Sequence, residues 1–180
     1  MIIVTKIYER CRSLLKETIW KCEGVSVRLG KNRVAHVLIR HDKSFCCDIG
    51  DGLAARRNVI LNISNGGTIR LGKNVFINDN VSINSQEKIY IGDNVIIGQG
   101  VMMFDHDHDY KSFNFRSEFK KAPITIGTGC WIGAGAIILK GSNIGNNCVI
   151  AAGTIVNRDI PDNTMFINKI NPEMISYYRV

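Results

Sequence analysis

Residues 126–161 read IGTGCW, IGAGAI, ILKGSN, IGNNCV, IAAGTI and VNRDIP, six consecutive hexapeptides that each begin with an aliphatic residue. The same frame appears earlier as LGKNVF, INDNVS and INSQEK over residues 71–88, and as IGDNVI and IGQGVM over residues 91–102. A period of six differs from the 3.6 of an α-helix and from the plain alternation of a hairpin strand. The repeat covers most of the 180-residue chain, which predicts a repeat architecture.

Each hexapeptide combines an inward aliphatic residue, a small residue where the chain bends, and a Gly-Asn or Asp-Asn turn that β-branched residues resist. Three short strands of this kind close one triangular coil of 18 residues or slightly more. Larger motifs recur at residues 29, 49, 71, 91, 126 and 144, so their spacing is 18 to 22 residues except for the 35 between Ile91 and Ile126. We therefore predict an all-β fold, a parallel β-helix in which one coil carries about 17 additional residues.

The additional residues form the segment 105–123, which opens with Asp105-His106-Asp107-His108-Asp109. A tight repeat does not need this excursion, and long loops on rigid scaffolds often carry function. Either imidazole titrates near neutral pH and could accept a proton from a hydroxyl. Histidine and carboxylate side chains also suit zinc, so a metal site is the competing interpretation.

The repeats resemble those of the hexapeptide-repeat acyltransferases, and the loop segment is similar to that of the galactoside, maltose and polysaccharide O-acetyltransferases. The resemblance implies left-handed coils, against the usual right-handed crossover rule. It also implies that a histidine after a coil's last strand is the catalytic base. A gapless alignment of the strand at residues 101–104 places His108 there, with His106 as the rival. Asp105, Asp107 and Asp109 would orient the ring.

The segment from Ile126 to Ala134 resembles the family's segment after the loop, with its tryptophan. The resemblance implies that Trp131 lies beside the active site and that backbone N–H groups at Gly133 and Ala134 hold the thioester carbonyl and pantetheine arm. It further implies that coenzyme A passes Ala152 and that its nucleotide end meets Asn157 and Arg158. The turn at residues 167–172 departs from the family pattern, which leaves one wall of the cofactor site undefined.

The remaining loop residues interleave aromatic and basic side chains, among them Tyr110 and Lys111. With Asp107, these two are our candidates for contact with the acceptor, in a flap that faces the sugar or the cofactor. Such a pattern can also bind nucleic acid, or can pin the loop to a neighbouring subunit. We expect no nucleic-acid partner, because the segment is short and lies next to the presumed base.

The two ends of the chain depart from the repeat. Apolar residues at helical spacing before Gly24 predict an amphipathic helix over residues 1–23 that covers the open end of the β-helix, with peripheral contact with a membrane surface as the alternative. The β-helix would extend over residues 24–170. Asn171-Pro172 would begin a short helix in residues 171–180.

Composition limits the remaining classes of protein. The chain shows neither a membrane-spanning apolar run nor a signal peptide, so a cytoplasmic protein is expected, with its six cysteines reduced. A net charge of +7 favours anionic partners such as a phosphorylated cofactor, an acidic glycan or a lipid surface. The flat faces of a triangular coil, and the family's placement of active sites between subunits, predict a homotrimer.

The combined prediction is a coenzyme A-dependent O-acetyltransferase that moves an acetyl group from acetyl-CoA, its co-substrate, to a sugar hydroxyl in bacterial surface polysaccharide synthesis. No metal is expected. Three alternatives stay open: an N-acetyltransferase of an amino-sugar, a zinc enzyme like the γ-class carbonic anhydrases, and a non-catalytic β-helix scaffold.

Overall fold

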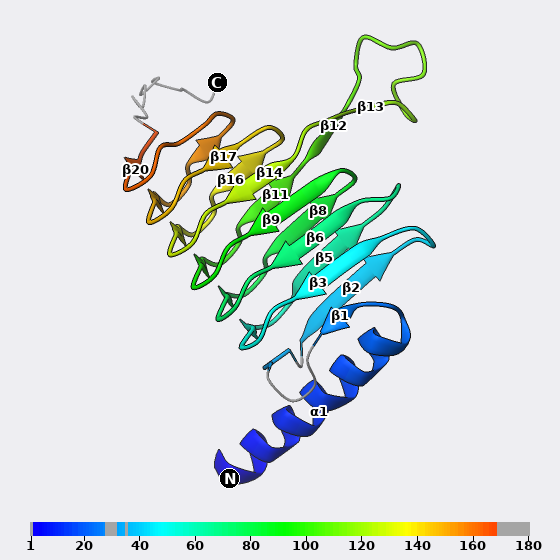
Figure 1. The fold of residues 1–180 in the computed structure, drawn as a ribbon, viewed down its shortest axis with the longest axis vertical. Coiled ribbons are helices and arrows are strands. Elements are labelled where there is room, and N and C mark those ends of the chain that lie inside the picture. The colour runs from blue at the N-terminus through cyan, green and yellow to red at the C-terminus, as the bar shows by residue number, and fades with distance from the viewer. Residues whose placement is uncertain (1, 28–31, 35, 169–180) are drawn as a thin grey trace, which may run out of the picture.

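The computed structural model describes residues 2–27, 32–34 and 36–168, with side chains from residue 7 onward. This part of the chain forms a left-handed parallel β-helix with an N-terminal helix, as predicted (Figure 1). The predicted helix over residues 171–180 and the motif at Leu29 lie outside the described residues. No helix in the described ranges has the length and apolar character needed to cross a membrane.

Three six-stranded parallel sheets form the sides of the described coils. Sheet A contains β1 (Ser26–Val27), β3 (Cys46–Ile49), β6 (Thr68–Leu71), β9 (Lys88–Ile91), β14 (Ile124–Ile126) and β17 (Asn143–Ile144). Sheet B contains β4 (Ala54–Ala55), β7 (Phe76–Ile77), β10 (Ile96–Ile97), β15 (Trp131–Ile132), β18 (Val149–Ile150) and β20 (Met165–Phe166). Sheet C contains β2 (Val37–His41), β5 (Val59–Ile63), β8 (Ser82–Ser85), β11 (Met102–Phe104), β16 (Ile137–Leu139) and β19 (Ile155–Val156).

The register confirms the coil spacing predicted from the repeat. Ile91 pairs with Leu71 on one side and with Ile126 on the other, so the 35 residues between Ile91 and Ile126 are one coil with an insertion. The residues that open the six hexapeptides, from Ile126 to Val156, are all buried in one continuous core. Each inward side chain therefore stacks on its counterpart in the next coil.

The corners of the triangle need the turn residues that the repeat supplies. Asn74, Asn94 and Asn147 adopt positive φ angles between the strands of sheets A and B, where a short polar side chain tolerates the left-handed conformation. The Asn74 amide also donates to the Asn94 side chain of the next coil (3.2 Å). Gly92 is needed for a different reason, because a Cβ atom there would lie 2.8 Å from the backbone of residues 127 and 128. Close coil stacking thus excludes side chains at this position.

Helix α1 (Ile2–Cys22) covers the end of the β-helix with a face that is mostly polar. Ser13, Glu17 and Trp20 are buried there. The Glu17 carboxylate accepts from the backbone N–H of Asn32 (3.0 Å), and the Ser13 hydroxyl accepts from that of Val34 (3.1 Å). The first coil has backbone groups with no further coil to bind, so a polar helix face satisfies them. The apolar residues that predict the helix lie on its opposite, exposed face.

Candidate active site

The insertion forms a hairpin at the corner where the chain passes from sheet C to sheet A, here called the C–A corner (Figure 1). Strands β12 (His106–His108) and β13 (Phe119–Lys121) pair antiparallel. The backbone N–H of Ala122 donates to the carbonyl of Asp105 (3.0 Å) and closes the base of the hairpin. The loop is therefore anchored to the coil, and both candidate histidines lie on its first strand.

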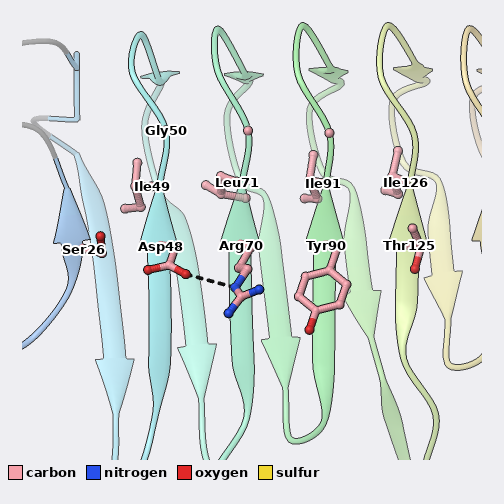
Figure 2. A pocket seen from close by; sticks show the side chains of 12 residues that line it. Ser26, Asp48, Ile49, Gly50, Arg70, Leu71, Tyr90, Ile91, Thr125 and Ile126 are labelled. Atoms are coloured by element: carbon pink, nitrogen blue, oxygen red, sulfur yellow. Dashed lines mark ion pairs between the residues drawn. The ribbon is translucent and has the colours of Figure 1, made fainter.

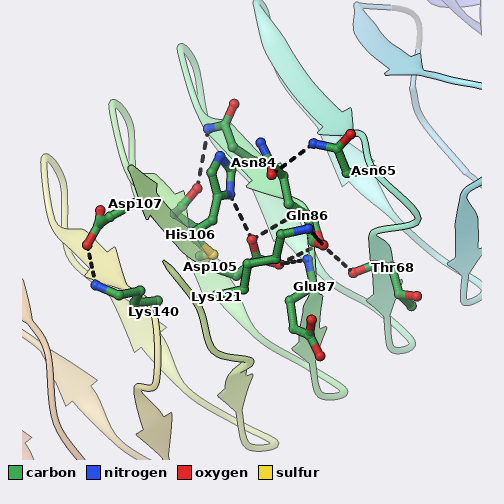
Figure 3. Close-up of polar contacts among 12 residues, drawn as sticks. Asn65, Thr68, Asn84, Gln86, Glu87, Asp105, His106, Asp107, Lys121 and Lys140 are labelled. Carbon is green, nitrogen blue, oxygen red and sulfur yellow. Dashed lines mark hydrogen bonds and ion pairs between the residues drawn. The ribbon is translucent and has the colours of Figure 1, made fainter. Parts of the chain in front are cut away.

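Asp105 is a fully buried carboxylate that binds the preceding coil (Figure 3). It accepts hydrogen bonds from the backbone N–H groups of Gln86 (2.8 Å) and Glu87 (2.9 Å) and from the Ser85 hydroxyl (2.7 Å). Its fourth partner is Nδ1 of His106 (2.9 Å). Burial acts to raise the pKa of Asp105, but the hydrogen bonds, led by that of His106, outweigh it and lower the pKa. Asp105 is thus an ionised anchor.

His106 is held by this carboxylate. An ionised carboxylate only accepts hydrogen bonds, so the bond to Asp105 requires a proton on Nδ1, and the tautomer that it selects has its lone pair on Nε2. The side chain is 17% exposed and meets the Phe119 ring edge-on at 5.6 Å. His106 is therefore well oriented but partly covered.

His108 lies two residues further along the hairpin strand and is exposed. Its Nδ1 atom lies 2.7 Å from the Phe115 carbonyl oxygen, which can only accept. The ring also lies against Phe119, with the ring centroids 4.5 Å apart. The neutral imidazole therefore carries its proton on Nδ1 and presents the Nε2 lone pair, as a general base requires.

The other hairpin residues named from the sequence lie around these rings. Asp107 forms an ion pair with Lys140 of the next coil (Figure 3). The hydrogen bond from Lys120 lowers the pKa of Asp109 (N–O 3.0 Å). Tyr110 is 77% exposed and lies near the Lys111 and Lys120 ammonium groups. Tyr110 and Lys111 are thus open to a ligand, whereas Asp107 and Asp109 already have cationic partners.

The tryptophan predicted beside the site lies on a different side of the triangle. Trp131 points outward from sheet B, in register with Ile96 and Val149, and is 54% exposed. The N–H of Gly133 donates to the Ile150 carbonyl (2.7 Å), which removes it as an oxyanion donor. Within the described residues, no acceptor binds the Ala134 N–H. Of the two predicted donors, only Ala134 remains available.

The predicted cofactor residues fall at two corners. Ala134 and Ala152 belong to successive turns between sheets B and C, and a Cβ atom at Gly133 would lie 2.5 Å from the Ala152 nitrogen. Asn157 and Arg158 are exposed at the C–A corner, after β19. The structure therefore places Asn157 and Arg158 at the same corner as the histidine hairpin, and Trp131, Ala134 and Ala152 away from it.

The chain's other two histidines lie near α1 and the residue that follows it. His36 lies 3.3 Å from Glu9, and His41 lies 3.9 Å from Glu23 and stacks on Phe45. Over residues 2–27, 32–34 and 36–168, no three His, Cys, Asp or Glu side chains gather in a way that could hold a metal ion.

A groove of about 540 Å³ lies on sheet A, outside the predicted site (Figure 2). Arg70 contacts two other residues that line the groove. Its Nε atom lies 2.9 Å from an Asp48 carboxylate oxygen, and its guanidinium lies 5.6 Å from the Tyr90 ring centre. None of the lining residues is a site residue named from the sequence. This groove is therefore separate from the histidine hairpin.

Several residues that bind the hairpin carboxylates were not predicted from the sequence. Ser85, Gln86 and Glu87 bind Asp105, and Lys140 binds Asp107. The coil spacing contains a signal for the first group, because Ser85 precedes Asp105 by 20 residues, one coil. Lys140 lies beyond the insertion, 33 residues from Asp107, where a fixed spacing does not indicate contact.

Residues 123–158 match the family model described as the hexapeptide repeat of succinyl-transferase. The chain is a hexapeptide-repeat protein. This hexapeptide-repeat protein is 37% identical over 123 residues to galactoside O-acetyltransferase of Escherichia coli, a match that covers 64% of the chain and 61% of that relative.

Two solved structures show the same similarity. A maltose O-acetyltransferase from Clostridium difficile is 35% identical, with a TM-score of 0.58 over 64% of this chain and 62% of that one. A hexapeptide-repeat acetyltransferase from Vibrio cholerae, solved in complex with acetyl coenzyme A, is 30% identical, with a TM-score of 0.52 over 72% of this chain and 64% of that one. The chain spans between half and about three fifths of the length of the curated relatives it matches first.

Proposed function

We propose that this chain is a coenzyme A-dependent O-acetyltransferase that moves an acetyl group from acetyl-CoA to a sugar hydroxyl. The observation that carries the proposal is His108, an exposed imidazole whose Nδ1 is bound to the Phe115 carbonyl and whose Nε2 is free. The similarity to galactoside and maltose O-acetyltransferases supports a sugar as the acceptor. We place the reaction in bacterial surface polysaccharide synthesis, such as that of O-antigen or capsule.

The proposed reaction is a single acyl transfer in a ternary complex. His108 Nε2 accepts the hydroxyl proton as the sugar oxygen attacks the thioester carbonyl, forming a C–O bond. The C–S bond then breaks, and the proton on His108 passes to the departing thiolate to give free coenzyme A and the acetylated sugar. The Ala134 N–H is our candidate to stabilise the oxyanion that forms between these steps.

We propose that the active site lies between subunits of a homotrimer. His108 projects from the C–A corner, whereas Trp131, Ala134 and Ala152 lie on sheet B and at its corner with sheet C. In a trimer with threefold symmetry, the Trp131, Ala134 and Ala152 of one chain can lie beside the histidine hairpin of its neighbour. Mass measurement by light scattering at micromolar concentration should give three chains, and a monomer would contradict shared sites.

The co-substrate site would use two kinds of contact. The open face of Trp131 offers apolar surface for the pantetheine arm. Arg158, exposed beside Asn157 at the C–A corner, can bind a phosphate of the nucleotide end. Acetyl-CoA is a co-substrate in this proposal, and none of its steps uses a metal.

The activity is tested by incubating the purified protein with radiolabelled acetyl-CoA and a panel of glycans that includes amino-sugars. Transfer to a hydroxyl gives an ester that mild alkali removes, whereas transfer to an amine gives an alkali-resistant amide. We expect an alkali-labile product. A resistant product would identify an N-acetyltransferase, and no transfer to any member of a broad panel would favour a non-catalytic scaffold.

A further inference from the structure

The outward face of helix α1 is apolar although the helix is docked. The large apolar residues of this face are 40% to 63% exposed: Ile7, Tyr8, Leu14, Leu15 and Ile19. The helical repeat places them on one side together with Cys11, Thr18 and Cys22, and we call this set the outer face. Monomeric proteins rarely expose a contiguous apolar patch of this kind without a partner for it.

The docking geometry explains why the outer face stays uncovered. The buried side of α1 carries Ser13 and Glu17, which bind backbone N–H groups of the first coil. Turning the apolar side inward would remove both bonds and leave those backbone groups unsatisfied. The helix lies across the end of the β-helix, and no other described element covers its far side (Figure 1). The outer face is thus fixed outward by the fold.

The charged side chains of the helix that border the outer face are cationic. Arg12 and Lys16 flank it on one side and Lys21 on the other. Arg12 and Lys16 lie close together: burial and then the nearby Arg12 charge lower the pKa of Lys16. The described carboxylates of the helix point toward the β-helix, since Glu9 pairs with His36 and Glu17 is buried. Glu23, just after the helix, acts on Lys16 and lies 3.9 Å from His41, so it is one negative charge near three positive ones. The partner of this face should therefore be apolar and anionic.

We propose that the outer face of α1 binds the surface of an anionic lipid bilayer. An apolar helix face bordered by lysine and arginine inserts at the boundary of headgroups and acyl chains, with its cations toward anionic headgroups. The Thr18 hydroxyl already donates to the Leu14 carbonyl (2.9 Å), so burial of this face leaves that hydroxyl satisfied. A second copy of the chain fits less well, because two such faces would bring like-charged borders together.

The proposal is tested by flotation of the full chain with phosphatidylcholine vesicles that contain or lack phosphatidylglycerol. Wild-type protein should float with the anionic vesicles and much less with the neutral ones, and added salt should weaken binding. The double variant Leu15→Ser, Ile19→Ser should lower the vesicle partition coefficient by roughly tenfold or more. Arg12→Gln combined with Lys21→Gln should lower it by about tenfold to thirtyfold.

The matched control is Met165→Ser, which removes a side chain that is 64% exposed at the opposite end of the β-helix. It should bind vesicles like the wild type. All substituted positions are at the surface, and unchanged circular dichroism and melting temperature would verify that each variant is folded. Acetyl transfer plays no part in the readout, so failure of the proposed enzymatic function would leave this test intact.

Two results would overturn the proposal. One is wild-type protein that stays with the soluble fraction in the presence of anionic vesicles, or serine variants that float as well as wild type. The other is a larger oligomer in solution that the double serine variant abolishes, without vesicle binding, because that result assigns the outer face to a second copy.

Discussion

Replacement of Asp105 tests whether the buried carboxylate anchors the hairpin. In Asp105→Ala, the backbone N–H groups of Gln86 and Glu87 lose their acceptor, whereas the Ser85 hydroxyl can donate its one proton to the Thr68 carbonyl instead, at 2.9 Å. A buried donor left without a partner costs about 1–3 kcal/mol, so two cost about 2–6 kcal/mol of unfolding free energy. At roughly 2–4 °C per kcal/mol for a domain of this size, the melting temperature should fall by about 5–20 °C.

Calorimetry or a thermal shift assay measures this change, and Asp109→Ala is the matched control. Asp109 also binds a lysine and a backbone N–H, but at the exposed part of the same hairpin. Surface ion pairs contribute little to stability, so the control should melt close to wild type. Equal losses in the two variants, or a negligible loss in Asp105→Ala, would refute the role of burial in this anchor.

The same carboxylate predicts a direction for the pH dependence. The pKa of Asp105 is lowered in the fold, so its contribution to stability is complete above the unfolded pKa of about 4 and is lost as the pH falls through the lower folded value. The stability difference between wild type and Asp105→Asn should therefore be constant near neutral pH and shrink below about pH 4. A difference that grows toward acid would show that the folded pKa is raised.

The remaining predictions concern the cofactor and the coil stack. Coenzyme A should raise the melting temperature of the protein, and Arg158→Ala should weaken this effect at low salt more than at high salt; undiminished protection would remove Arg158 from the site. Gly92→Ala forces a Cβ atom to within 2.8 Å of the next coil's backbone and should destabilise the fold by about 1–3 kcal/mol, as measured by urea unfolding; a neutral effect would contradict the close stacking at this corner.

The sequence predicts the β-helix well because the six-residue period of its aliphatic residues is also the period at which side chains enter the core. Every sixth residue from Ile126 to Val156 is buried, and the 35-residue spacing between Ile91 and Ile126 locates the insertion. A residue's place in such a repeat determines its coil, its sheet and its direction.

The hydrophobic pattern of the sequence does not predict which face of α1 is buried. Apolar residues at helical spacing normally mark the buried face, but this helix packs on open backbone edges, which need hydrogen-bond partners more than apolar cover. Ser13 and Glu17 carry no periodic signal for such a role. A hydrophobic pattern therefore predicts the helix but not the face that it buries.

The sequence identifies which residues could form the candidate site, but it predicts only part of their geometry. The sequence places two histidines on the insertion, but it does not show that Asp105 holds one ring and the Phe115 carbonyl the other. It also does not show that the Gly133 N–H is already bound to the Ile150 carbonyl. These contacts depend on how the coils stack and on the register of the hairpin, and neither can be derived from the order of residues alone.

The central claim is that His108 is the base of an acetyl transfer, and its most direct test is the turnover of His108→Ala beside that of His106→Ala, with and without a chelator. We predict that His108→Ala lowers kcat by roughly 10²- to 10⁴-fold with nearly unchanged coenzyme A affinity, that His106→Ala costs much less, and that the chelator has no effect. A reversed order would give the role to His106, and loss of wild-type activity on chelation would indicate a metal enzyme. Full activity in both variants would contradict the mechanism.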